Sequence, residues 1–536
     1  MTSMSALQST MSRVSSAPFQ DAGLPSALPA SQQAPAVASP STIVSIGANN
    51  QGRAPDPTYS IPATALPLQW KTRSSDAVSS LMAGNFFTSS IGNRFQGIGS
   101  ALLGMLKNGT SQFAQSVTQA LTKSTSESTA VTKPGTDQVQ YPLAEQKLRI
   151  QTKSGIDVEI VLSSQDDRLE VQMQSSGELS DAERVALGNL AGAFQDAIDG
   201  ISAKDPVLNL TGLTKFDSTV LASVDFHSSI TLNQKGPQTL DFHADSANRR
   251  VKLDGPLGTL DVSVDMRDSS IWGNSKQRAA AIDNYVKQFD KAASRGNADK
   301  ALATMFKDAF TQMNSDYVAP SQQPKITLAD VDHAMLTGMA DFKASVKQVP
   351  QSSNPKILSE VDTFSYDASQ TTKVGGDGQF NRTIAQQQQS HLTASYHMSL
   401  VPNVPLILTT DNKSQNYYYK QIDDSAESSI GIAYTKGVLS EAFSVQSAKQ
   451  STRTSKYELG QLSSDITVPS EASQQRDILE SLKPLMDELK KDSPSAVYNW
   501  QKKLEEVHGQ ILLQADPADI NNTGWNIADI QAPSSR

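Results

Sequence analysis

The chain has 536 residues, and its 46 Lys and Arg stand against 55 Asp and Glu, for a formal net charge of −9. This length exceeds one ordinary hydrophobic core, so we expect two folded domains and flexible tails. The charges form no basic face or stripe, which predicts that the protein has no nucleic-acid partner. The chain contains no cysteine, which excludes disulfides, thiolate metal ligands and a cysteine nucleophile.

Residues 1–66 are rich in Ser, Ala, Pro and Gln and contain only two acidic and two basic residues. Such a segment buries too little apolar surface to offset the entropy of ordering, so we predict a disordered tail. It lacks the apolar core of a conventional signal peptide. A Ser-rich, weakly charged start is typical of proteins exported by type III secretion, and a chain without disulfides can be threaded through a channel. We therefore expect secretion without a classical signal peptide; the alternative is the bacterial cytoplasm.

Residues 74–123 are predicted to form an amphipathic helical segment. Apolar residues from Val78 to Leu121 recur near helical spacing, although several glycines interrupt them. Arg94 and Lys107 help to break any run of about 18 apolar residues, so no transmembrane span is expected. We expect the segment to pack on protein, and contact with a membrane surface is the alternative interpretation.

The next segment alternates between apolar and polar residues, as strands do. The runs 148–152, 156–160 and 169–173 predict a three-stranded meander with one apolar face. Ser180 and Glu183 have the spacing of a capping box at the start of a helix, and apolar residues follow at helical spacing. That helix is predicted to cover the apolar face of the meander.

The same stretch carries a resemblance. The run 177–183, the apolar residues Leu187, Leu190 and Phe194, and the run 216–218 that leads into a strand are similar to a module found in uncharacterised bacterial proteins. The resemblance covers residues 148–232. It implies a bacterial origin and brings no catalytic residue.

The rest of the central region groups its strands before its helices. This grouping predicts an α+β domain over residues 141–319 rather than alternating βαβ units. Its further strands are expected at 220–232, 239–242, 250–253 and 259–266, and its helices at 275–294 and 298–314.

Pro320 and Pro324 suggest a boundary near 319–326, followed by a second α+β domain over residues 326–513. Its strands should form an antiparallel sheet with one wet face, and residues 514–536 should form a flexible tail. The predicted elements are a helix at 328–346, strands within 364–368, 392–398, 417–419 and 431–434, a strand pair at 440–459, and helices at 471–490 and 495–510.

One pair of strands carries a candidate metal site. If the strands on either side of the turn at 234–237 form a hairpin, Phe226 and Phe242 face the core. Two imidazoles and two carboxylates then face outward together, which is a possible ligand set for zinc or another divalent ion. The alternative is a solvated face with polar pairs across the strands. The candidate ligands are Asp225, His227, Asp241 and His243.

Other polar residues give weaker indications of a site. His391 and His397 are expected on one strand face, too far apart to bind one ion, and we interpret them as surface residues. Asp423, Asp424 and Glu427 are interpreted as solvated loop acids, although a carboxylate pair could perform acid–base chemistry.

No local catalytic or nucleotide-binding signature occurs in the sequence, and we predict no cofactor and no catalytic residue. The hypothesis that fits best is a bacterial, non-enzymatic protein that acts through contact with a protein partner. The alternative is a metal-assisted or carboxylate-based hydrolase that uses the Asp/His face.

Overall fold

All residues that the computed structural model describes lie between positions 68 and 522. The predicted tail at 1–66 and residues 523–536 lie outside the part of the chain that the structure describes. The described residues are 68–72, 75–119, 143–165, 167–232, 236–317, 325–490 and 493–522.

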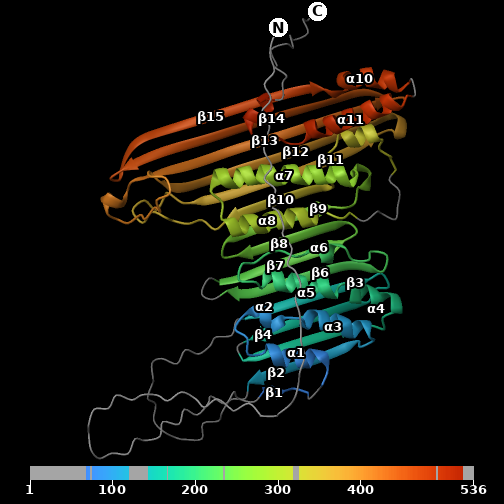
Figure 1. Ribbon diagram of the computed structural model, residues 1–536, viewed down its shortest axis with the longest axis vertical. Coiled ribbons are helices and arrows are strands. Elements are labelled where there is room, and N and C mark those ends of the chain that lie inside the picture. The colour runs from blue at the N-terminus through green and yellow to red at the C-terminus, as the bar shows by residue number, and fades with distance from the viewer. Residues whose placement is uncertain are drawn as a thin grey trace, which may run out of the picture. The chain divides into compact units, whose positions relative to one another are not determined.

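All fifteen strands of the described residues join one antiparallel sheet (Figure 1). The strand order begins β1-β2-β5-β4-β3-β6 and then follows the chain to β15. The strands are β1 (Leu68–Trp70), β2 (Gln112–Gln119), β3 (Ala144–Thr152), β4 (Asp157–Gln165), β5 (Arg168–Ser175), β6 (Leu221–Leu232), β7 (Gly236–Asp245), β8 (Asn248–Gly255), β9 (Gly258–Asp265), β10 (Asp341–Gln348), β11 (Thr363–Gly376), β12 (Arg382–Ser399), β13 (Tyr417–Thr435), β14 (Val438–Glu458) and β15 (Gln461–Asp477).

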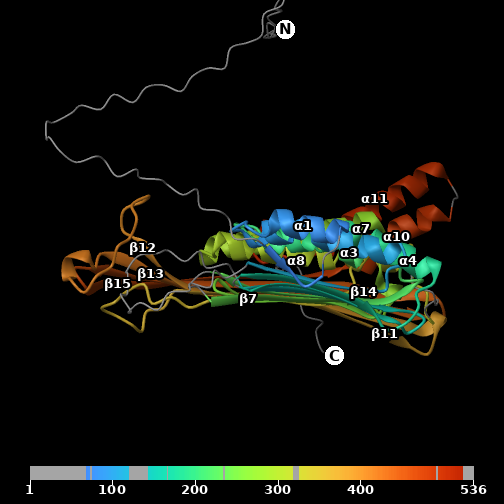
Figure 2. The same cartoon turned by 90° about the horizontal axis from the view of Figure 1, so that it is seen from below.

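Figure 2 shows that the helices lie on one side of the sheet, while the opposite face, here called the open face, carries none of them. The α-helices are α1 (Ala77–Asn85), α2 (Ile91–Phe95), α3 (Ile98–Lys107), α4 (Asp181–Asn189), α5 (Ala191–Ile201), α6 (Thr211–Thr214), α7 (Ser275–Gly296), α8 (Lys300–Met313), α9 (Asp330–Ala334), α10 (Ile478–Leu489), α11 (Pro494–Ile511) and α12 (Pro517–Asn522). Short 3-10 helices are η1 (Ser269–Ile271), η2 (Gln379–Asn381) and η3 (Asn412–Ser414).

The core lies between the helices and the sheet, because every second strand residue points toward the helices. Strand β3 shows this alternation of buried and more exposed residues along its whole length. Phe194 of α5 packs edge-on against Phe226 of β6, with ring centroids 5.9 Å apart. Farther along the sheet, Phe289 of α7 packs against Phe306 and Tyr366. Burying such aromatic side chains is the main favourable term that holds each helix on the sheet.

The two sheets predicted on either side of residues 319–326 are one sheet. Strand β9 pairs with β10 from Asp265↔Asp341 to Gly258↔Gln348, and α8 packs on both strands. The α+β class with antiparallel strands and covering helices is therefore confirmed, whereas the division into two domains is not. The prolines at 320 and 324 lie in the connection between β9 and β10, but these two strands pair directly, so the prolines do not mark a boundary between two sheets.

Most predicted elements between residues 148 and 314 are confirmed. The meander is β3, β4 and β5, and Ser180 and Glu183 form a complete capping box. The covering helix is two helices, α4 and α5, which meet at Leu190.

Four predicted elements are wrong in whole or in part. Residues 112–119 of the predicted helical segment form β2, because Phe113 and Val117 pair with the edge of β5. The helix predicted at 328–346 is only the short α9, and Phe342 and Val346 alternate in β10. The strand pair at 440–459 is the single strand β14. The helix predicted at 471–490 is confirmed only from Ile478 onward, as α10, because residues 471–477 belong to β15.

The predicted flexible tail at 514–536 is ordered in its first part. Helix α12 lies against β14 and β15, and its Ile520 is buried in the core. The rest of that tail lies beyond the described residues.

The helical segment packs on protein, as preferred from the sequence. Val78, Phe86, Phe95 and Leu102 have no exposed surface, so these apolar side chains are not available for contact with a membrane surface. Among the described helices, none is long and apolar enough to cross a membrane.

Candidate functional site

Polar side chains line the open face of the sheet from β8 to β14. The strand register places Asp261, Ser345 and Asp367 opposite one another on β9, β10 and β11. The same row continues through His391 on β12 and Ser425 on β13. Cross-strand neighbours on one face are close enough to interact, so these side chains form a continuous polar surface.

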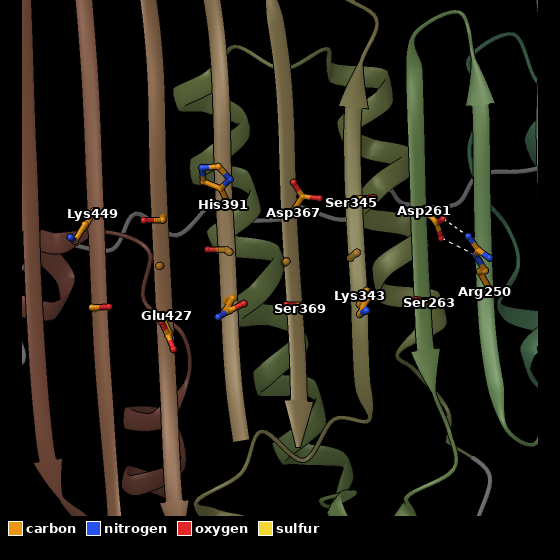
Figure 3. A pocket seen from close by; sticks show the side chains of 17 residues that line it. Arg250, Asp261, Ser263, Lys343, Ser345, Asp367, Ser369, His391, Glu427 and Lys449 are labelled. Carbon is orange, nitrogen blue, oxygen red and sulfur yellow. Dashed lines mark hydrogen bonds and ion pairs between the residues drawn. The ribbon is translucent and has the colours of Figure 1, made fainter. Parts of the chain in front are cut away.

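The centre of this surface is a shallow hollow of about 820 Å³. Figure 3 shows Arg250 and Asp261 side by side on neighbouring strands, joined by two hydrogen bonds of 3.1 and 2.6 Å. Asp367 and His391 lie opposite each other on β11 and β12, and β10 separates this pair from Asp261 on β9. The polar side chains that line the hollow are Arg250, Asp261, Ser263, Lys343, Ser345, Asp367, Ser369, Gln389, Ser390, His391, Ser425, Glu427, Ser447 and Lys449.

Charges of both signs are interspersed across this hollow. The hydrogen bonds and charge of Asp261 raise the pKa of Arg250 above its ordinary value. Partial burial raises the pKa of Asp367, and the imidazole of His391 opposes that effect. The surface therefore offers donors and acceptors to a ligand without one dominant sign of charge.

The four predicted metal ligands lie beside this hollow on the same face. As predicted, the hairpin of β6 and β7 turns Phe226 and Phe242 toward the core, where both are buried. Asp225 lies directly opposite His243, and His227 lies opposite Asp241. The structure thus brings all four side chains together at one place.

Each imidazole of this set is bonded to the carboxylate across from it. His227 Nδ1 lies 2.7 Å from Asp241 Oδ1, and His243 Nδ1 lies 2.7 Å from Asp225 Oδ1. The hydrogen bond to Asp225 is the main reason why the pKa of His243 is raised. In the described ranges, no group of three or more His, Asp or Glu has an arrangement that could hold a metal ion. This geometry is that of polar pairs across strands.

The prediction that His397 is a surface residue is wrong. His391 is half exposed on the open face, but only 1 % of the His397 side chain is exposed. The two histidines share a strand face, and residues 349–362, here called the covering segment, pack over His397 alone. Its Nδ1 lies 2.6 Å from Asp362 Oδ1, and its Nε2 lies 3.1 Å from Glu360 Oε2.

Tyrosines complete this buried cluster. Tyr417 donates its hydroxyl to Glu360 Oε2 at 2.6 Å and stacks on Tyr457. Burial lowers the pKa of His397, but the two carboxylates outweigh burial and raise it to about 9. The imidazolium and its two acids hold the covering segment on the sheet. The run of tyrosines at 417–419 was the one sequence feature that could have indicated a covered polar site.

The acids at 423–427 lie in β13 and not in a loop, which corrects the sequence interpretation. Asp423 faces the open side and bonds to His391 at 2.8 Å. Asp424 faces the helices and accepts a 2.5 Å hydrogen bond from Arg295 of α7. Neighbouring residues of a strand point to opposite faces, so the two carboxylates cannot act as an acid–base pair.

No family model, curated protein or solved structure matches the chain. The resemblance of residues 148–232 to a bacterial module therefore stays a prediction.

Proposed function

We propose that this is a bacterial, non-enzymatic protein that acts by binding another protein through the open face of its sheet. The observation that carries this proposal is the broad polar surface from β6 to β14, which no described helix covers and which the covering segment covers only around His397 and Tyr417. An antiparallel sheet commonly keeps one face wet, but a wet face of this breadth is also an extended platform for a partner.

The dimensions of the platform suit a protein better than a small ligand. Nine neighbouring strands at about 4.8 Å spacing span roughly 40 Å. A standard protein interface takes about 800 Å² from each partner, which this face can supply. Small-molecule sites are concave and mostly apolar, whereas the hollow at the centre of this face is shallow and polar.

Charge reversal on the platform tests the proposal. The variant Lys343→Glu/Lys449→Glu changes two open-face charges, and the matched control Lys287→Glu/Lys300→Glu changes two charges on the helices α7 and α8. Immobilised full-length proteins are incubated with extract of the native bacterium or of cells it contacts. We expect wild type and control to retain a discrete protein that the open-face variant loses. Equal retention by all three would contradict the proposal.

We also propose that the protein is secreted by a type III-like route that reads residues 1–50, with residence in the bacterial cytoplasm as the alternative. The support is the weakly charged, Ser-rich start of the sequence. A fusion of residues 1–50 to a reporter is compared in medium and pellet, with and without a working secretion apparatus. A reporter and a full-length protein that both stay in the pellet would refute export.

A hydrolase remains the second candidate, because the His–Asp pairs of β6 and β7 border a hollow of about 540 Å³ on the open face. Metal analysis of the purified protein separates the two functions. Stoichiometric zinc or manganese that is lost in the variant His227→Ala/His243→Ala would favour the metal-assisted hydrolase over a binding protein.

A further inference from the structure

Strand β15 forms one edge of the sheet, and no strand of the described residues lies on its outer side (Figure 1). An edge strand presents a row of unpaired N–H and C=O groups that can pair with a further strand. β15 has 17 residues, and every residue from 461 to 471 is exposed. At the other end of the sheet, β1 has only three described residues. The sheet therefore has one long, uncovered edge.

The sequence of β15 favours pairing along this edge. Natural edges are commonly protected by lysines, and β15 contains none. The one charged residue among its first ten is Asp465, which Arg453 of β14 holds through hydrogen bonds of 2.9 and 2.6 Å. Ile466, Thr467 and Val468 are β-branched, and the exposed fractions are 58 % for Ile466 and 62 % for Val468. Such residues stabilise a pleated strand when a neighbour packs beside them.

The hydrogen-bond pattern shows which backbone groups of β15 point outward. Ser451 of β14 lies opposite Pro469, and its N–H donates to Asp424 of β13 at 3.2 Å, so it points away from β15. Two residues opposite each other in an antiparallel pair direct their N–H and C=O groups either toward each other or both away. Pro469 therefore points outward, where its missing N–H breaks no bond to β14. Because the direction alternates along a strand, the N–H and C=O groups of Asp465 and Thr467 point outward as well.

Two irregularities limit the part of this edge that can pair. The register of β14 and β15 shifts at Ser463, which is an extra residue of β15. Such a bulge disrupts pairing on one side, and Pro469 has no N–H to donate on the other. Residues 464–468 lie between these limits, and Ile466 is their midpoint.

We propose that β15 pairs antiparallel with β15 of a second copy of this chain, about a two-fold axis at Ile466. In this register, Asp465 of each copy lies opposite Thr467 of the other, and the two residues exchange their outward backbone hydrogen bonds. The bulge at Ser463 then lies opposite Pro469 of the other copy, so both irregularities fall at the ends of the paired segment.

The neighbouring registers are less favourable. An axis at Asp465 would set two like charges directly opposite each other, and an axis at Thr467 would place Asp465 opposite Pro469, which has no N–H to donate. A second copy is also favoured over a growing chain of copies. The two-fold pairing closes after two copies, whereas the three described residues of β1 are too few to receive β15 in a head-to-tail contact.

An engineered disulfide tests the pairing, because the chain contains no cysteine. On the axis, Ile466 lies opposite itself in a pair without mutual hydrogen bonds, with Cα atoms about 4.5 Å apart, a separation that suits a disulfide. We expect Ile466→Cys in the full-length protein to form a disulfide-linked dimer under mild oxidation. The control Val438→Cys, 64 % exposed at the other end of β14, should form none.

Sedimentation velocity tests the pairing without a crosslink. Wild type at about 100 µM should contain dimer, since an interface below standard size binds weakly. Thr467→Pro removes an outward N–H from each copy without removing a bond to β14, and it should weaken dimerisation by about tenfold or more. The control Thr467→Val keeps that N–H and should dimerise as wild type does. Unchanged thermal unfolding of each variant shows that the fold is intact.

Wild type that is monomeric at every concentration would overturn the proposal. A Thr467→Pro variant that dimerises as wild type does would overturn it too, as would crosslinking at position 466 no greater than in the control. If wild type is monomeric and Thr467→Pro instead loses a protein retained from bacterial extract, the edge serves a different partner and the proposal fails. The pairing leaves the open face free, so these results are independent of the partner proposed for that face.

Discussion

The buried ion pair between Asp332 of α9 and Arg382 of β12 offers a quantitative test of the fold. Asp332 Oδ2 lies 2.7 Å from Arg382 Nη2, and Asp332 Oδ1 accepts a 2.6 Å hydrogen bond from Tyr434 of β13. The Arg382 guanidinium stacks on the Tyr434 ring at 3.5 Å. Neither charged side chain has appreciable exposure to solvent. This network fastens the short helix α9 to the neighbouring strands β12 and β13.

Replacing Asp332 by Ala removes the counter-charge and leaves the guanidinium buried. Breaking such a pair from one side costs about 3–5 kcal/mol, whereas replacing both partners by apolar residues costs far less. We therefore expect Asp332→Ala to lower the free energy of unfolding by about 3–5 kcal/mol, and Asp332→Leu/Arg382→Met to lower it less than Asp332→Ala does. Urea unfolding followed by circular dichroism measures both values.

The matched control is Asp423→Ala, because the Asp423 carboxylate is 73 % exposed and pairs with His391. An exposed pair contributes about 0–1 kcal/mol, so this variant should unfold close to wild type. A loss below about 1 kcal/mol for Asp332→Ala, or a double variant that is destabilised as much as Asp332→Ala or more, would refute the reasoning.

Three further predictions concern other parts of the sheet. The pKa of His397 is about 9 against an ordinary 6.5, so the protonated imidazole stabilises the covering segment fully below pH 6.5, and this stabilisation is lost as pH rises through 9. Protease should therefore cut residues 349–362 faster at alkaline pH in wild type, and His397→Gln should abolish that pH dependence. Hydrogen bonds led by that of Ser154 lower the pKa of Glu183 to about 2. Glu183→Ala should therefore lower the free energy of unfolding by about 1 kcal/mol at neutral pH. Urea unfolding should show that this difference from wild type shrinks as pH falls from 4.5 through 2. Gly99→Ala should cost about 1–3 kcal/mol, since a Cβ would come within 2.9 Å of a ring of α5, whereas Gly104→Ala in the same helix meets nothing within 4 Å and should not destabilise.

Alternation of apolar and polar residues was enough to predict the strands whose partners lie next to them in the chain. It located β3, β4 and β5 and the pair β6 and β7. It failed at residues 341–348, where Phe342, Ala344 and Val346 alternate, because apolar residues at 334–340 extended an apparent helical spacing. Those residues are buried for a reason that lies outside their own sequence: Thr337 and Met339 form hydrogen bonds with Gln370 of β11 and Gln386 of β12, farther along the chain.

The single sheet could not be predicted because it depends on one pairing across a long connection. Strand β10 joins β9 although some 75 residues separate them, and no local pattern specifies such a contact.

The candidate site was predicted where it depended on a hairpin and missed where it did not. The opposition of Asp225 and His243 follows from the turn between β6 and β7. The burial of His397 depends on residues 349–362, which cross back over strands β12 and β13. A histidine flanked by polar residues looks the same in sequence whether or not such a segment covers it.

The claim that the open face binds a protein is tested most directly by site-specific photo-crosslinking in living cells. A photoreactive residue replaces Ser345 or Ser425 on the open face, or Lys300 on the exposed side of α8 as the control. A discrete protein adduct from both open-face positions, absent from the control, is the predicted result. No adduct from the open face, or the same adduct from all three positions, would contradict the account.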